Sequence, residues 1–165
     1  MLGIDPGSRI LGFGVVERRG NRLIHVAHGF ARFGATSDLA NRLGSIYESI
    51  SAVLAEHRPA CVAVEGLFTF RSARSALTLA QARGAALASV ANQGLPVYEY
   101  APAEVKRAVG AHGAGAKEQV QRMVAMLLGL TRFDRPDCAD ALAVAVCHLN
   151  RASFAQRVAA AGHLP

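Results

Sequence analysis

One short apolar run most constrains what this chain can fold into. Residues Ala60–Val64 form a continuous stretch rich in β-branched side chains, and the stretch ends at Glu65-Gly66. A run of this length without polar alternation is typical of a strand that is buried on both faces. Because helices cover both faces of such a strand, the run predicts a layered α/β domain.

The rest of the chain shows two periods. Alternating segments at Leu11–Glu17 and Leu23–Arg32, with a turn at Arg19-Gly20-Asn21, predict a β-hairpin. After Gly34, apolar residues recur every three or four positions, as in an amphipathic helix. Short strands are expected at residues 1–4 and 96–100, and helices at residues 39–57 (with Asp38 as N-cap), 72–92, 102–109, 116–128 and 136–149.

This order predicts a mixed five-stranded sheet with helices on both faces. With 165 residues, 52% of them hydrophobic, we expect a single domain over residues 1–150 and a frayed tail over residues 151–165. The first strand is so brief that we expect a few residues to precede it in the natural chain. No apolar run approaches the roughly 20 residues that span a bilayer, and no signal peptide is evident, so we expect a cytoplasmic protein without a membrane partner.

The charge balance favours a polyanionic partner. Lysine and arginine number 18 against 12 acidic residues, which gives a net charge of +6 and an isoelectric point near 9.9. Such a chain attracts nucleic acid, because phosphate neutralisation dominates protein–nucleic acid affinity. The only lysines are Lys106 and Lys117, and either chance or a need for a compact ammonium group explains them.

The cysteines and histidines do not predict a metal site. The three cysteines lie in separate apolar segments and are expected to be buried free thiols. His25 and His28 lie in an alternating segment, where a spacing of three places side chains on opposite faces. We therefore expect no catalytic role for them.

Two acids end predicted strands. Asp5 follows the opening strand and Glu65 follows the buried strand, so both are expected at the edge of the sheet where α/β proteins bind ligands. On its own, Asp5-Pro6-Gly7 is more typical of a turn than of a site. Glu65 is harder to explain structurally, because a charge beside so apolar a strand is unfavourable unless it is paired or bound to a metal.

Two more acids open the last predicted helix, where Asp137 and Asp140 share a face. Acids in a first turn also stabilise the helix dipole by roughly a few tenths of a kcal/mol, which explains Asp137 better than Asp140. Together with Asp5 and Glu65 they form an oxygen-only donor set, which selects hard ions such as Mg²⁺ or Mn²⁺. Two such ions can activate water and stabilise the leaving oxygen of a phosphodiester.

Six segments between residue 3 and about residue 150 carry a family resemblance. They are Gly3–Ser8 with Gly12–Val16, Val64–Phe68, Ser75–Gly84, Pro96–Lys106, Lys117–Val120 and Asp137–Ala145. Each is moderately specific, and in this order they are similar to the RuvC family of Holliday-junction resolvases, within the RNase H-like superfamily.

The resemblance implies an RNase H-like fold and a homodimer that makes paired symmetric nicks in a four-way DNA junction, leaving ends that ligase can seal. It places Asp5, Glu65, Asp137 and Asp140 on the family's catalytic acids, with two Mg²⁺ ions (or Mn²⁺ as substitute) in each active site. We expect Asp5 to bridge the ions. A role in homologous recombination and DNA repair, and a branch-migration motor as partner, are implied as well.

The resemblance also indicates DNA contacts. Phe68 matches a base-contacting aromatic, and stacking on an unpaired base contributes roughly 1–3 kcal/mol. Lys106 and Lys117 match lysines that contact DNA or take part in catalysis. Arg71 and Arg74 share a helical face suited to phosphates, although solvated surface explains them nearly as well. The family dimerises through the helix over 72–92, whose small residues permit close approach: Ala82, Gly84, Ala85, Ala86 and Ala88.

Three alternatives remain open. An RNase H-like nuclease acting on RNA or a hybrid shares the acids, and only Phe68 and the lysines favour a junction. A module that binds branched DNA without cutting is expected to lose acids, and none is lost here. An actin-like ATPase has a turn similar to residues 5–8, but this chain is too short for its second lobe.

Overall fold

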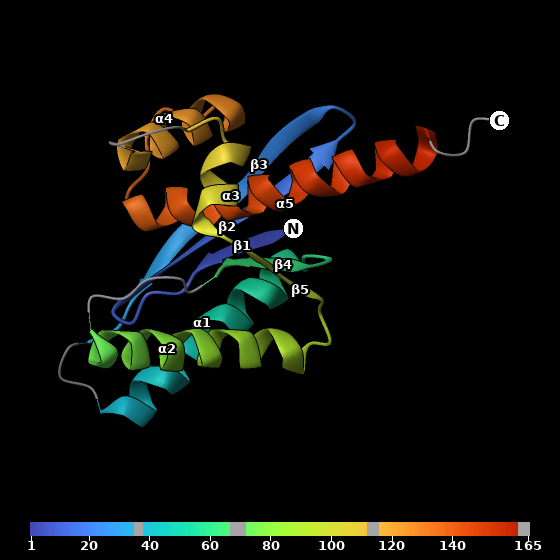
Figure 1. Cartoon of the computed structure of the whole chain (residues 1–165). Helices are drawn as coiled ribbons and strands as arrows, with labels where there is room; N and C mark the ends of the chain where they lie inside the picture. Colours follow the sequence, from blue (N-terminus) through green and yellow to red (C-terminus); the bar gives the residue numbers. More distant parts are fainter. Residues whose placement is uncertain (35–37, 67–71, 112–115, 162–165) are drawn as a thin grey trace.

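Five strands form one mixed sheet in the computed structural model, which describes residues 1–34, 38–66, 72–111 and 116–161 (Figure 1). The strands are β1 (Leu2–Asp5), β2 (Ile10–Arg19), β3 (Arg22–Arg32), β4 (Val62–Glu65) and β5 (Val97–Tyr100). Their order is β3-β2-β1-β4-β5; β1 pairs antiparallel with β2 and parallel with β4. The expected hairpin and the mixed five-stranded sheet are confirmed.

Helices cover both faces of this sheet. They are α1 (Leu39–His57), α2 (Ala73–Asn92), α3 (Pro102–Ala108), α4 (Ala116–Leu128) and α5 (Pro136–Ala161). In Figure 1, α1 and α2 lie on one face, and α3, α4 and α5 lie on the other. Within the part of the chain that the structure describes, none of the helices has both the length and the apolar character needed to cross a bilayer.

A local signal explains the start of α1, whereas the end of α5 differs from the prediction. The Asp38 carboxylate accepts a hydrogen bond from the backbone N–H of Asn41 at 2.9 Å, as an N-cap does. The last helix was expected to end at Leu149, but α5 continues to Ala161. The added segment is rich in alanine and contains no glycine or proline, so nothing in it ends a helix. The division of the chain at residue 150 remains a proposal.

A bulge in the hairpin overturns one prediction. Val15 pairs with Ala27 and Val16 with His25, so β3 has one extra residue at this point. The extra residue reverses the alternation, and His25 Nε2 lies 2.8 Å from His28 Nδ1. The prediction that these two side chains lie on opposite faces is wrong, because strict alternation does not hold across a bulge.

The inner strands alternate between two cores. Leu2, Ile4, Val62 and Val64 belong to the core under α1 and α2, whereas Ala63 belongs to the core under α5. All five side chains are fully buried. β1 and β4 are therefore covered on both faces, as the apolar run predicted.

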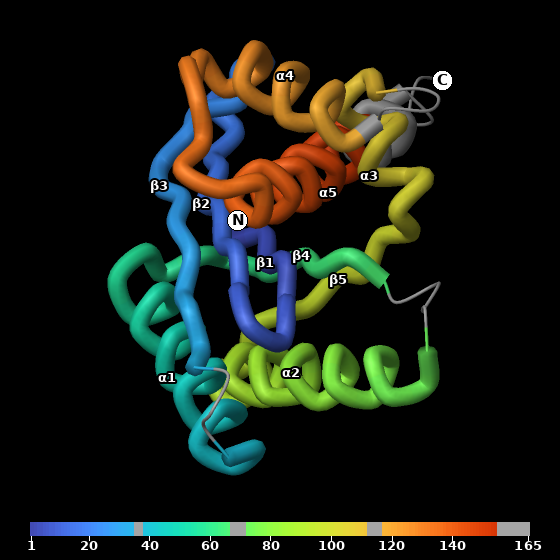
Figure 2. Tube along the Cα trace, turned by 90° about the vertical axis from the view of Figure 1, so that its left-hand side faces the viewer, coloured from blue at the N-terminus to red at the C-terminus, as the bar shows by residue number. Residues whose placement is uncertain are grey.

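Glycines let α5 lie directly on the backbone of the sheet (Figure 2). A Cβ atom at Gly3 would lie 2.0 Å from the carbonyl oxygen of Ala141, and one at Gly12 would lie 2.1 Å from the carbonyl oxygen of Asp137. Any other residue would force the helix away at these positions. Gly12 is the cross-strand partner of Asp5, so this contact brings the start of α5 to the end of β1.

Candidate active site

The ends of β1 and β4 place Asp5 and Glu65 side by side. The two strands are parallel neighbours in register. Gly3 contacts α5, and Ala63 belongs to the core under it. Because side chains alternate along a strand, Asp5 and Glu65 point to this same layer.

Helix α5 supplies the other two acids. Asp137 lies in its first turn and Asp140 one turn further along. The backbone of Asp137 lies over Gly12, beside Asp5. The structure thus gathers the four predicted acids at one end of the sheet, between β1, β4 and α5.

Electrostatics show that the four acids form one cluster. Burial raises the pKa of Asp5 to about 7, and the charges of Asp140, Asp137 and Glu65 contribute to the same shift. Burial is also the main cause of the raised pKa of Glu65, and Asp140 adds to it. The pKa of Asp140 is raised by burial despite the opposing charge of Lys117. Such mutual repulsion favours a proton or a bound cation.

Both lysines of the chain lie beside these acids. Lys117 Nζ is 3.3 Å from Asp140 Oδ2, and its pKa is raised mainly by this carboxylate. The charge of Lys106, on α3, lowers the pKa of Glu65 and so opposes the effect of burial there. The clustering of the only two lysines supports the functional explanation of their retention.

Two arginines that the sequence analysis did not single out also adjoin the acids. Arg135, just before α5, places its Nε 3.2 Å from Asp137 Oδ2. Arg83, on α2, is only 6% exposed; it pairs with Glu99 at 2.7 Å and donates a long 3.5 Å hydrogen bond to the backbone oxygen of Glu65. The signals for Arg83 are its place in one of the six segments that carry the resemblance and its charge within an alanine-rich helix.

The acids fit a hard divalent ion by donor chemistry, although they do not form a finished coordination sphere. Among the described residues, no three Asp, Glu, His or Cys side chains are arranged to hold a metal ion. Asp140 and Asp137 are instead paired with Lys117 and Arg135. Carboxylate oxygens remain the preferred ligands of Mg²⁺. Burial, and then the charges of the neighbouring acids, raise the pKa of Asp5, and a divalent ion would favour its carboxylate form against both effects.

The structure tests the other predicted contact residues only in part. Phe68 and Arg71 lie outside the described residues. Arg74 is exposed in the first turn of α2, and its side chain makes no ion pair or hydrogen bond among the residues that the structure describes. Of the small residues in α2, Ala82 and Ala86 face the core and are not available for close approach of a second chain, whereas the others are exposed or half-buried.

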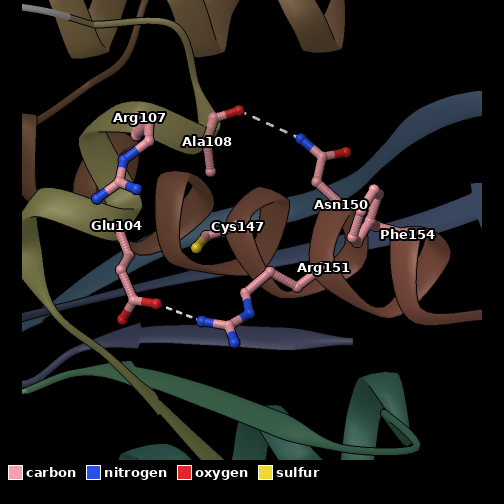
Figure 3. A pocket seen from close by; sticks show the side chains of 7 residues that line it. All are labelled: Glu104, Arg107, Ala108, Cys147, Asn150, Arg151 and Phe154. Carbon is pink, nitrogen blue, oxygen red and sulfur yellow. Dashed lines mark hydrogen bonds and ion pairs between the residues drawn. The ribbon is translucent and has the colours of Figure 1, made fainter. Parts of the chain in front are cut away.

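Contacts around a cavity of about 690 Å³ fix α3 against α5 (Figure 3). Arg151 pairs with Glu104 across its opening, and Asn150 Nδ2 donates to the carbonyl oxygen of Ala108 at 3.2 Å. These contacts join the helix of Lys106 to the helix of Asp137 and Asp140. The cavity itself lies away from the four acids, beside the later turns of α5.

Comparison with known proteins identifies the family. Residues 1–148 match the family described as crossover junction endodeoxyribonuclease RuvC. The chain belongs to the RuvC family. The RuvC enzyme of Myxococcus xanthus is 53% identical over 98% of this chain and 85% of its own, and that of Geobacter sulfurreducens is 51% identical over 92% and 93%. RuvC proteins are metal-dependent endodeoxyribonucleases, and this chain is therefore a DNA-hydrolysing enzyme.

Solved structures agree with the family and the fold. Thermus thermophilus RuvC in complex with a Holliday junction substrate superposes with a TM-score of 0.84 at 35% identity, over 93% of this chain and 96% of that chain. A yeast mitochondrial Holliday junction resolvase shares the fold, with a TM-score of 0.61 at 13% identity over 88% and 77%. The expected RNase H-like architecture is confirmed.

Proposed function

We propose that this chain resolves four-way DNA junctions by hydrolysing one phosphodiester in each of two strands, using Asp5, Glu65, Asp137 and Asp140 with two Mg²⁺ ions. The observation that carries the proposal is the convergence of these four acids in a chain of the RuvC family. The similar Thermus protein bound to a junction supports the choice of substrate. The ions would activate a water molecule and stabilise the leaving oxygen.

The surroundings of each acid suggest its task. Asp5 is the most strongly shifted, and it senses all three of the other acids, so it is the best candidate to bridge two ions. Glu65 lies on the α3 side of it, and Asp137 and Asp140 lie on the α5 side. Ends that ligase can seal carry a 3′-hydroxyl and a 5′-phosphate, so the bond that breaks is the one between phosphorus and the 3′-oxygen.

The cations around the acids would hold the DNA backbone. Lys117 opens α4 and is 64% exposed at its side chain, so it can reach a phosphate while it neighbours Asp140. Helix N-termini also favour phosphate. Lys106 would contribute from the side of Glu65, and Phe68 and Arg71 would contact the junction from the segment that follows Glu65.

Paired cutting needs two active sites, and we infer that α2 forms the dimer contact. Leu77, Gly84 and Ala88 lie at helical spacing on an exposed stripe, and Leu77 is 61% exposed. A Cβ at Gly84 would meet nothing within 4 Å, so a neighbouring helix has room to approach. A cytoplasmic location, a role in recombination and repair, and a branch-migration motor as partner complete the proposal.

One substrate panel tests this function. The purified protein is incubated with a synthetic four-way junction, a duplex of the same sequence and an RNA–DNA hybrid, in Mg²⁺, Mn²⁺ or EDTA. Paired nicks confined to the junction and dependent on the metal are expected. Cutting of the hybrid in preference would favour an RNase H-like activity, and binding of the junction without any cutting would favour the non-cutting module.

A further inference from the structure

Arg135 lies where its charge is unfavourable for the helix that follows it. The backbone N–H of Cys138 donates to the carbonyl oxygen of Arg135 at 3.2 Å, which makes Arg135 the residue at the entrance of α5. A helix N-terminus carries a partial positive charge, so a cation here destabilises the helix, and side chains such as Ser or Asp are the usual choice. Helix formation therefore does not explain this arginine.

Two contacts hold its guanidinium in a defined orientation. Nε lies 3.2 Å from Asp137 Oδ2, and the guanidinium carbon lies 5.5 Å from the centre of the Phe30 ring. The terminal Nη atoms have no partner among the residues that the structure describes. An arginine stacked on an aromatic ring with its outer edge free is already oriented to bind a phosphate.

The position of Phe30 relates this pair to the acids. Phe30 lies opposite Gly12 in the hairpin, and Gly12 lies opposite Asp5. Directly opposed residues of antiparallel strands share a face, so Asp5, Gly12 and Phe30 form one row across the sheet. At about 4.8 Å between strands, Phe30 lies roughly 10 Å from Asp5 along this row. Phe30 lies on the edge strand β3 and is 38% exposed, so its ring is accessible beside the site.

We propose that Arg135, stacked on Phe30, binds a phosphate of the DNA strand that crosses the four acids, next to the phosphate that is cut. It does so on the β3 side of the site, while Lys106 acts on the opposite side, near Glu65. This inference rests on the proposed function. It extends the substrate-binding surface to an edge of the sheet that holds none of the predicted DNA contacts.

Binding of a four-way junction in EDTA, measured over a range of salt concentrations, tests the inference without cutting. Each phosphate contact contributes about 0.7–0.9 to the slope of log K against log salt. Arg135→Gln is expected to lower the slope by about 1 and to weaken binding about fivefold. Arg135→Lys keeps the charge and is expected to retain the slope with intermediate affinity, and Phe30→Leu is expected to weaken binding in the same direction but less.

Arg19→Gln is the matched control. Arg19 is also an ion-paired arginine, 2.8 Å from Glu17, but it lies at the hairpin tip, at the far end of the sheet from the acids. Its loss is expected to leave the slope unchanged. If Arg135→Gln keeps the wild-type slope, or alters only the melting temperature, the inference fails although the proposed function stands. If the wild-type protein does not bind the junction at all, the proposed function fails.

Discussion

Lys117 Nζ lies 3.3 Å from Asp140 Oδ2, and this contact joins the first turn of α4 to the second turn of α5. The ammonium group is held mainly by one acid, but it also senses Asp5 and Asp137. The start of α4, the start of α5 and an exposed cation thus surround one oxygen-rich cluster. The positive charge of Lys117 offsets part of the repulsion among the carboxylates.

Replacement of Lys117 is expected to impair cutting more than binding. Lys117→Met removes the cation nearest to Asp140, and loss of one electrostatic contact in an active site typically lowers the rate by about 10²-fold. Single-turnover cleavage of a junction at saturating protein measures the effect. Arg122→Gln on the exposed side of α4 is the control and is expected to cut normally. Equal losses in both variants would show that α4 acts by its overall charge.

Asp5→Asn is expected to abolish cutting, by about 10³-fold or more, and to leave junction binding intact or tighter. The reason is that Asp5 senses all three of the other acids, so its loss disrupts the whole cluster while it removes negative charge facing the DNA backbone. Nicking assays in Mg²⁺ and band shifts in EDTA separate the two effects. Nicking at the wild-type rate would remove Asp5 from the active site.

The pH dependence of stability follows from the same residue. The pKa of Asp5 is raised from 3.8 to about 7 in the folded chain, so the folded state holds an extra proton between these values. The contribution of Asp5 to the free energy of unfolding therefore falls as pH rises through this window. In EDTA, the stability gain of Asp5→Asn over wild type should be larger at pH 8 than at pH 5, as urea unfolding measures. A gain independent of pH contradicts the raised pKa.

Metal affinity, unlike stability, should increase as pH rises. The ion binds the carboxylate form, so protons compete with it below the pKa of Asp5. At subsaturating Mg²⁺, junction cleavage is expected to rise about tenfold per pH unit below pH 7 and to level off above it, because a single proton is displaced. Saturating Mg²⁺ should move the midpoint to lower pH. If the pH midpoint of cleavage does not depend on the Mg²⁺ concentration, the titrating group is not Asp5.

The glycine contact under α5 predicts a sharp contrast between two alanine substitutions. Gly12→Ala puts a Cβ 2.1 Å from the carbonyl oxygen of Asp137, so it should destabilise the chain by about 1–3 kcal/mol and displace the acid. Gly44→Ala, on α1, meets nothing within 4 Å and should stabilise the chain by about 0.5–1 kcal/mol. Urea unfolding and junction cleavage of both variants test the contrast; similar behaviour would contradict close packing of α5.

The acids could be predicted from the sequence, whereas their partners could not. Asp5 and Glu65 end apolar strands, and Asp137 and Asp140 start a helix, so local patterns place all four. Arg135 has a carboxylate two residues away and an aromatic ring on a distant strand, and the pairing of that strand emerges only when the sheet forms. The register of β3 could not be predicted either. One extra residue in β3, opposite Val15 and Val16, changes the face of the sheet on which the His25 side chain lies.

The fold was predictable to the level of strand number and helix coverage. The apolar run at residues 60–64 specified a doubly covered strand, and the change of period after Gly34 separated hairpin from helices. The glycines at positions 3, 12 and 14 do not by themselves predict the direct contact between α5 and the sheet. A glycine in a strand is compatible with a bulge, a bend or a close approach, and only the opposing element decides among them.

Because α5 lies on bare backbone at Gly3 and Gly12, the separation of Asp137 from Asp5 is not set by side-chain volumes. On the face covered by α1 and α2, a substitution by a larger side chain can be compensated by a smaller one nearby, so the composition of that core can change while its volume is kept. At Gly3 and Gly12 the α5 face offers no such exchange, because the helix backbone lies directly over the strands there. Directed evolution of this enzyme should therefore leave these two glycines unchanged, and attempts to change the separation of Asp137 from Asp5 would have to move the strands rather than repack side chains.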